Sequence, residues 1–185
     1  VYIDLIKNDF KGKEFLTTGM RKEVDRCKLA IEEALKGKTV AMISSGDAGV
    51  YGMAGIMYQV AAEHPELEIE VVPGITAACS GAAVLGAPLI SDFCLISLSD
   101  LLTPWEKIVK CLDCASQADF CICLYNPSSF KRHDYLQKAC DIMLKNQRPD
   151  VPAGIVRNIG RDGENYEITT LQELRDKEVD MFSTV

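Results

Sequence analysis

The sequence of 185 residues lacks several features that define other classes of protein. It contains no run of about 18 apolar residues, so no membrane-spanning helix is predicted, and its charged N-terminal stretch does not resemble a secretion signal. Its two histidines, His64 and His133, are too few for a histidine-based metal site. The G-x-G-x-x-G, G-K-[ST] and G-x-S-x-G motifs are also absent, so neither a phosphate-binding loop nor a serine hydrolase is expected.

Basic residues are fewer than acidic ones, with 20 Lys and Arg and 27 Asp and Glu, so the net charge is −7. A negative field repels a long polyanion, so no nucleic-acid partner is expected. Hydrophobic residues make up 48% of the chain, which is enough to build a core and excludes intrinsic disorder as the main state.

Cysteine, in contrast, is abundant, with eight residues that lie mostly in apolar segments. We interpret them as buried free thiols in a reducing cytoplasm. Cys111-x-x-Cys114 and Cys121-x-Cys123 offer four sulfur atoms, but one pair falls on a predicted helix and the other on a predicted strand. Structural zinc sites usually lie on turns, so core packing is favoured, no protein-bound metal is expected, and a metal site is the alternative.

Hydrophobic periodicity predicts alternating helices and strands, which is typical of an α/β fold. Helices are expected over 20–36, 52–63 and 75–86, then from the capping box at 103–106, through Leu136 to Leu144, and from a second capping box at 170–173. Strands are expected over 39–45, 67–72, 93–99, 119–125, 151–158, 166–169 and 181–185, and the first residues, VYIDLI, are also strand-like. A small-residue helix and Ala87-Pro88 predict two lobes, 1–88 and 89–185.

Three segments follow predicted strands, where open α/β sheets bind ligands. In Ser44–Gly55, glycines three residues apart leave one face bare beside Asp47, although a helix cap with packing glycines explains the pattern equally well. In Val72–Ala78, Pro-Gly makes a turn, and Thr76 either caps the next helix or offers its hydroxyl to a ligand. In Leu124–Ser129, a Tyr and an Asn could stack on and hydrogen-bond to a planar group, or simply form a strand exit and turn.

A group of basic residues follows these segments. In an acidic protein such a group could receive carboxylates, but solvated surface is the alternative. The members are Lys131, Arg132, His133, Arg157 and Arg161.

Read in order, the segments SSGDAGVYGMAG, VVPGITAACSGAAVLGAPL, DFCLISLSDLLTPWEKI, LYNPSSFKR and NIGRDGE resemble the C17-methyltransferases of cobalamin biosynthesis. These belong to the tetrapyrrole methylases, which use S-adenosylmethionine and release S-adenosylhomocysteine. The resemblance covers nearly the whole chain. It implies two α/β/α lobes with the cofactor in a cleft between them, and a chain that lacks the family's first strand and loop and its C-terminal end.

The resemblance also implies an activity and a set of site residues. The activity is methylation of C17 of precorrin-3B or cobalt-precorrin-3 with ring contraction, by a cytoplasmic homodimer. The alternatives are a sister methylase that acts on another macrocycle carbon, or a non-catalytic nucleotide-binding module. The resemblance implies that the cofactor contacts Gly46, Asp47, Val50, Tyr51, Thr76, Ala77, Leu124, Tyr125 and Asn158. The residues expected to bind the carboxylates of the substrate are Lys131, Arg132, Arg157 and Arg161. The acid or base for ring contraction is unidentified, and its weak candidates are Asp92, Ser99 and Asp100.

Overall fold

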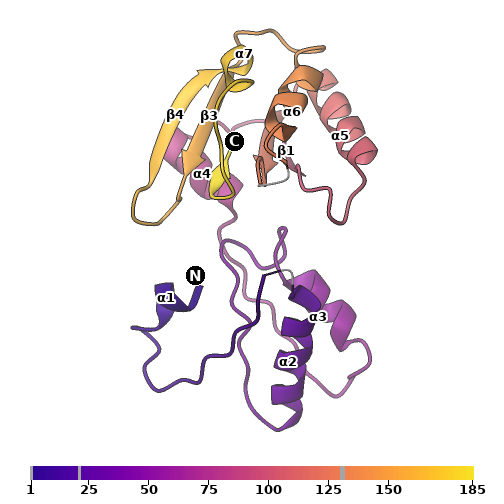
Figure 1. Ribbon diagram of the computed structural model, residues 1–185, viewed down its shortest axis with the longest axis vertical. Helices are drawn as coiled ribbons and strands as arrows, with labels where there is room; N and C mark the ends of the chain where they lie inside the picture. Colours follow the sequence, from indigo (N-terminus) through magenta and orange to yellow (C-terminus); the bar gives the residue numbers. More distant parts are fainter. Residues whose placement is uncertain (1, 21, 130–131) are drawn as a thin grey trace. The chain divides into compact units, whose positions relative to one another are not determined.

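The computed structural model describes residues 2–20, 22–129 and 132–185 (Figure 1). It divides into two compact units, of which unit 1 ends at Thr76 and unit 2 runs from Ala77 to Val185. The sequence predicts a division at 88/89 instead; the difference is one helix, α4 (Ala77–Leu85), which packs on a strand of unit 2.

The described residues of unit 1 form three helices, α1 (Tyr2–Ile6), α2 (Glu23–Leu35) and α3 (Ala54–Ala61). Helices α2 and α3 pack against each other, and α2 buries Cys27 and Ile31, which lie four residues apart on one face. Gly37 follows the C-cap residue Lys36 of α2, and its positive φ of 84° and its N–H bond to the Ala34 carbonyl close the last turn. Helices α2 and α3 confirm the periodicity of 20–36 and 52–63.

The strands predicted for unit 1 are not formed. Segments 39–45 and 67–72 have no strand partner among the described residues, and Val40, Ile43 and Val72 are exposed. A strand exists only when a neighbour pairs with its backbone, and apolar content does not supply that neighbour. The strand-like residues VYIDLI instead include helix α1.

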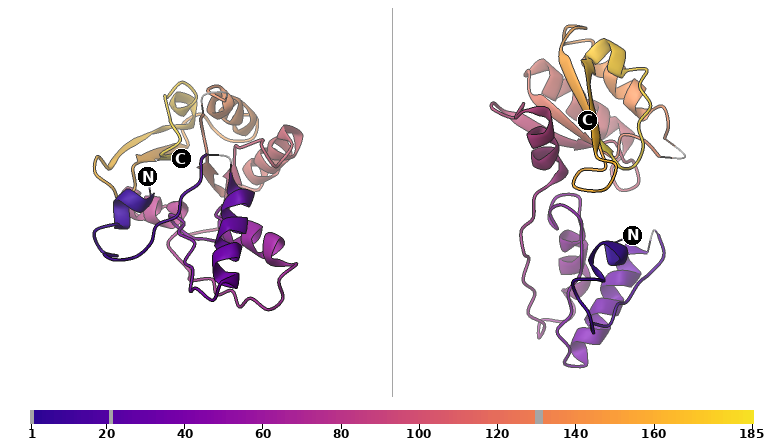
Figure 2. Two further views of the ribbon diagram at one scale, coloured as in Figure 1. Left: turned by 60° about the horizontal axis from the view of Figure 1, so that its bottom comes forward. Right: turned by 90° about the vertical axis from the view of Figure 1, so that its left-hand side faces the viewer.

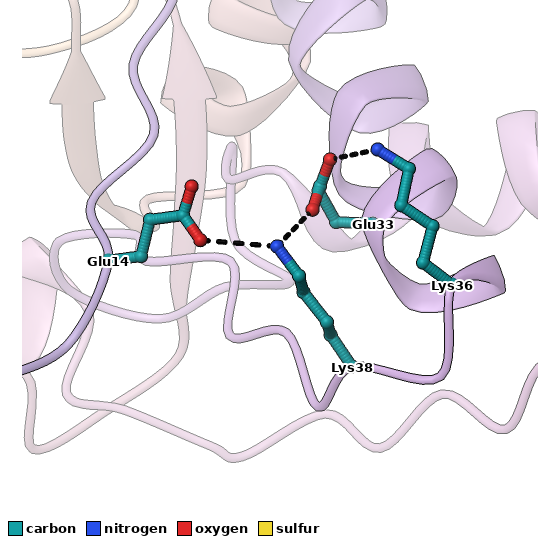
Figure 3. Close-up of polar contacts among 4 residues, drawn as sticks. All are labelled: Glu14, Glu33, Lys36 and Lys38. Carbon is teal, nitrogen blue, oxygen red and sulfur yellow. Dashed lines mark hydrogen bonds and ion pairs between the residues drawn. The ribbon is translucent and has the colours of Figure 1, made fainter.

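A network of charges joins the end of α2 to the segments beside it (Figure 3). The Glu33 carboxylate accepts hydrogen bonds from Lys36 Nζ and Lys38 Nζ, both at 2.5 Å, and Lys38 also pairs with Glu14 at 3.1 Å. The two lysine hydrogen bonds lower the pKa of Glu33 to about 2, and those with Glu33 and Glu14 raise the pKa of Lys38. The network ties residues 14 and 38, which are distant in sequence, to one helix.

Replacing Glu33 with glutamine is expected to lower the thermal midpoint of unit 1 at pH 7. Because folding lowers its pKa, Glu33 stabilises the fold above the ordinary glutamate pKa of about 4.3, and this contribution disappears as pH falls toward 2. Circular dichroism melts of the variant and the natural protein should therefore differ at pH 7 and converge in acid. Glu32→Gln, an exposed acid on the same helix, is the control, and an equal loss there would contradict the assignment.

The part of unit 2 that the structure describes contains five strands. Strands β1 (Phe93–Ser97) and β2 (Cys121–Tyr125) pair in parallel, whereas β3 (Pro152–Arg157) pairs antiparallel with both β4 (Asn165–Thr170) and β5 (Ser183–Thr184). The two sheets are linked because Leu124 and Val185 exchange backbone hydrogen bonds of 2.7 and 3.2 Å. The strand order is therefore β1-β2-β5-β3-β4.

Helices cover both faces of these strands (Figure 2). On one face, α5 (Trp105–Gln117), α6 (Tyr135–Met143) and α7 (Leu171–Leu174) bury a core with Ile155 of β3. On the other face, α4 lies against Gly154 and Val156. These two residues flank Ile155 in β3 and therefore face the opposite side of the sheet. Unit 2 thus has the α/β/α layering expected of its lobe.

The two predicted capping boxes have different outcomes. At α7, Thr170 Oγ1 accepts a hydrogen bond from the Glu173 N–H, so this box is confirmed. At α5 the N-cap is Pro104, which has no side-chain acceptor, so the prediction of a Thr103 cap is wrong. No helix in the described part of the chain is long and apolar enough to cross a membrane.

Candidate functional site

Two loops of unit 1 meet at one carboxylate. Asp47 Oδ1 accepts hydrogen bonds from the N–H groups of Gly49 (2.8 Å) and Val50 (3.1 Å), and Oδ2 accepts one from the N–H of Gly74 (2.9 Å). The Gly74 bond is the main cause that lowers the pKa of Asp47, and the Gly49 bond is the next. Asp47 is therefore ionised at neutral pH and joins the first two predicted segments.

Glycines allow this approach. A Cβ at Gly74 would meet the Gly46 carbonyl oxygen at 2.0 Å, so no side chain fits between the loops. Gly46 itself has a φ of 71°, which favours glycine. We call Gly46, Asp47 and Gly74 the Asp47 junction.

Large apolar and aromatic side chains near the Asp47 junction in the sequence are exposed to solvent. Tyr51 has a φ of 53°, which is strained for a residue with a side chain, and is 53% exposed. Val72 and Ile75 are 73% and 70% exposed, although apolar side chains of this size are usually buried. An aromatic ring and exposed aliphatic groups next to a carboxylate suit a ligand with a flat apolar part and a polar part. Thr76 directly precedes α4 in sequence, and Ala77 is the first residue of α4.

Unit 2 brings together the ends of two parallel strands. Tyr125, the last residue of β2, accepts a hydrogen bond at its hydroxyl from the N–H of Ala78 in α4 (2.7 Å). Asn126 has a φ of 51° and donates from Nδ2 to Ser97 Oγ at the end of β1 (2.9 Å). The predicted planar-group residues therefore also hold local structure, which is a role that the sequence does not reveal.

A polar network lies beyond the end of β1. Asp100 Oδ2 accepts a hydrogen bond from the Tyr135 hydroxyl (2.7 Å), and Arg132 Nη1 lies 3.7 Å from Asp100 Oδ1. The hydrogen bond to Asp100 raises the pKa of Tyr135. Arg132 Nη1 is buried and has no hydrogen-bond partner among the described residues. Tyr135 could not be predicted as a site residue from the sequence, because a tyrosine at the start of a helix carries no signal of its partner.

Of the other two proton-transfer candidates, Ser99 lies next to Asp100 in the sequence and Asp92 lies at the opposite end of β1. Ser99 donates its backbone N–H to Ser97 Oγ and stays near Asp100 in sequence. Asp92 precedes β1, so the five-residue strand, about 16 Å long, separates it from the end where Tyr125 lies. Asp92 and Asp100 therefore do not belong to one site.

Two of the predicted cofactor residues have limited freedom to contact a ligand. Leu124 is 1% exposed, and its N–H and C=O groups bond to Val185, which argues against direct contact. Asn158 has a φ of 53° and forms the turn after β3, where its carbonyl accepts the N–H of Arg161 (2.9 Å).

The described arginines of the predicted basic group contact two segments of unit 2, the one before β5 and the one after β1. Arg157 donates to the Glu178 carbonyl (2.9 Å), and the Arg161 guanidinium lies over the Phe182 ring at 5.8 Å, whereas Arg132 contacts Asp100. Lys131 lies outside the described residues.

The cysteines are less buried than expected. Three of them, Cys27, Cys123 and Cys140, are buried, and burial raises the pKa of the Cys140 thiol to about 12. Cys111 and Cys114 are exposed, because they lie on the solvent face of α5, opposite Leu112. Among the described residues no group of three or more metal-binding side chains is placed to hold an ion.

An apolar hollow of about 460 Å³ lies within unit 2. It is bordered by α4, β2 and β3, and Cys121, Cys123 and Leu85 are among its lining residues. Of the predicted site residues that the structure describes, Ala77, Asp92 and Leu124 line it.

Comparison with known proteins identifies the family. The sequence profile of the tetrapyrrole (corrin/porphyrin) methylases matches residues 4–175. The chain is 45% identical to a Salmonella typhimurium protein named "Probable cobalt-factor III C(17)-methyltransferase", over 100% of this chain and 77% of that protein. It is 39% identical to a precorrin-3B C(17)-methyltransferase of Sinorhizobium, over 89% of this chain and 66% of that protein.

Solved structures agree. The crystal structure of the methyltransferase CobJ superposes with a TM-score of 0.85 at 35% identity, covering 96% of this chain and 77% of that chain. Other curated relatives are longer, and the chain spans only 35% of one that is 46% identical to it. The sequence match and the shared fold lead to one conclusion: this chain belongs to the tetrapyrrole methylase family.

Proposed function

We propose that the protein transfers a methyl group from S-adenosylmethionine to C17 of a precorrin-3-type macrocycle, with ring contraction, in cobalamin biosynthesis. The observation that carries the proposal is the similarity along the full chain to relatives named as C17-methyltransferases. The motifs ISLSDLLTPWE and LYNPSS, which resemble the C17 enzymes specifically, favour this carbon over another position of the macrocycle.

The loops joined at the Asp47 junction are the proposed cofactor-binding elements of unit 1. Exposed Tyr51 and Ile75 offer apolar surface to an adenine or a methionine chain. S-adenosylmethionine supplies an activated methyl group, and S-adenosylhomocysteine is the product. The contributions of Thr76, Ala77, Tyr125 and Asn158 remain part of this proposal.

Methyl transfer needs alignment more than a strong base, because it is an in-line displacement at carbon. The protein's task is therefore to hold the acceptor carbon in line with the methyl group and to exclude water. Ring contraction needs a proton donor or acceptor, and Asp100 is the candidate with a built network, through Tyr135 and Arg132.

Calorimetry with S-adenosylhomocysteine tests the proposal at its first step. We expect saturable binding of one molecule per chain. A complete absence of binding by the folded protein would instead favour the non-catalytic module. A homodimer and a cytoplasmic location are part of the same proposal, and sedimentation tests the first of them.

Arg132 is the best-supported candidate for a substrate carboxylate, because Nη1 is buried without a hydrogen-bond partner among the described residues. Arg132→Gln is expected to raise the KM for the macrocycle about tenfold and to leave S-adenosylhomocysteine affinity unchanged. Arg148→Gln, which removes an exposed arginine paired with Asp150, should change neither. Equal losses of macrocycle and cofactor affinity in Arg132→Gln would refute the assignment.

A further inference from the structure

We infer that Asp47 acts as a positioning residue, which locks the two cofactor loops of unit 1 to each other, and not as the counter-charge of the bound sulfonium. The inference rests in part on the proposed function, since it concerns how that cofactor is held. It deepens the proposal by assigning a specific role to a residue that the sequence only places near the cofactor.

The two carboxylate oxygens of Asp47 accept hydrogen bonds from different loops. Oδ1 holds the first loop in its turn through the N–H groups of Gly49 and Val50, which are two and three residues away. Oδ2 reaches the N–H of Gly74, which is 27 residues away and belongs to the second loop. One atom therefore fixes the local turn, and the other fixes the distance between the loops.

Close packing at Gly74 fixes the geometry of its hydrogen bond to Asp47. The Cα of Gly74 lies so close to the Gly46 carbonyl that a Cβ would meet that oxygen at 2.0 Å. The loops are thus in backbone contact on one side and hydrogen-bonded through Asp47 on the other. This pair of contacts restrains Tyr51 and Ile75, which follow the two contact points by only a few residues.

The same bonds weaken Asp47 as a counter-charge. A carboxylate has about four acceptor positions, and three of them are taken here by backbone N–H donors. These donors occupy most of the lone-pair directions, so a sulfonium has little room for close contact with the carboxylate oxygens.

Asp47→Asn separates the two roles. Its amide oxygen can keep the turn at the Oδ1 position, but the amide NH₂ then faces the N–H of Gly74, so the bond between the loops is lost. If Asp47 positions the loops, affinity for S-adenosylmethionine, which is cationic, and for S-adenosylhomocysteine, which is neutral at sulfur, falls by the same factor, about ten- to hundredfold. If Asp47 is a counter-charge, only the S-adenosylmethionine affinity falls.

Kinetics add a readout that loss of stability alone would not change. Misplaced loops misalign the methyl group, so kcat at saturating cofactor is expected to fall about tenfold or more, with the KM for the macrocycle little changed. Asp25→Asn is the matched control, because it removes the same charge from an exposed pair with Lys22 in the same unit. It should leave both affinities and kcat unchanged.

A separate measurement keeps the inference testable if the proposed function fails. Amide hydrogen exchange of the ligand-free protein is expected to show faster exchange at Gly74 in Asp47→Asn, with Gly49 and Val50 protected as before. Unchanged exchange at Gly74, or a selective loss of S-adenosylmethionine affinity, would overturn the inference. Failure of the natural protein to bind either compound would reject the proposed function, and the exchange result alone would then decide whether the lock exists.

Discussion

Gly74→Ala is expected to weaken S-adenosylhomocysteine binding by about ten- to hundredfold while unit 2 keeps its fold. The new Cβ would lie 2.0 Å from the Gly46 carbonyl oxygen, and both partners are backbone, so the loops must separate. Overpacking of this kind costs about 1–3 kcal/mol, and a ligand that needs the loops together must supply that energy. Calorimetry measures the loss.

Gly55→Ala is the matched control for this prediction. A Cβ at Gly55 meets nothing within 4 Å, and the residue lies in helix α3, where alanine is the better helix former. Its affinity should be unchanged and its thermal midpoint equal or higher. Natural affinity in Gly74→Ala would show that the loops do not form the cofactor site as proposed.

Leu112→Ala is expected to destabilise unit 2 by about 2–5 kcal/mol, because a large buried side chain is replaced by a cavity. Leu112 of α5 is 0% exposed and belongs to the core that α5 and α6 bury on β1 and β2. The single tryptophan of the chain, Trp105, lies in α5 against Tyr135, with 4.4 Å between the ring centroids. Its fluorescence during urea unfolding therefore reports on unit 2.

Lys110→Ala on the exposed face of α5 provides the comparison for this core substitution. It should change the free energy of unfolding by less than about 0.5 kcal/mol. If Leu112→Ala were equally mild, Leu112 would not be part of a close-packed core.

The elements of unit 2 could be predicted from the sequence because each has a local signature. Helix α5 alternates buried Ile108 and Leu112 with exposed lysines, and Thr170 with Glu173 marks the start of α7. The strands of unit 1 could not be predicted in the same way. Residues 39–45 have the apolar content of a buried strand, but pairing depends on a neighbour that no local pattern encodes.

The candidate site was only partly visible in the sequence. Gly46 and Asp47 stand out because glycines and an acid follow an apolar run, but the bond from Asp47 to Gly74 spans 27 residues and needs the fold. The same holds for Asp100 and Tyr135, which are 35 residues apart. Arg157 and Arg161 both contact the segment before β5, whereas Arg132 contacts Asp100 after β1, and the sequence does not reveal these partners.

Identifying the reaction product tests the proposed C17 methylation most directly. The protein is incubated with S-adenosylmethionine bearing an isotope-labelled methyl group and with precorrin-3B or its cobalt-containing counterpart, and the product is examined by mass spectrometry and NMR. We expect one added methyl group at C17 of a ring-contracted macrocycle, formed from at least one of the two substrates. A label at another carbon, or no transfer by protein that binds S-adenosylhomocysteine, would contradict it.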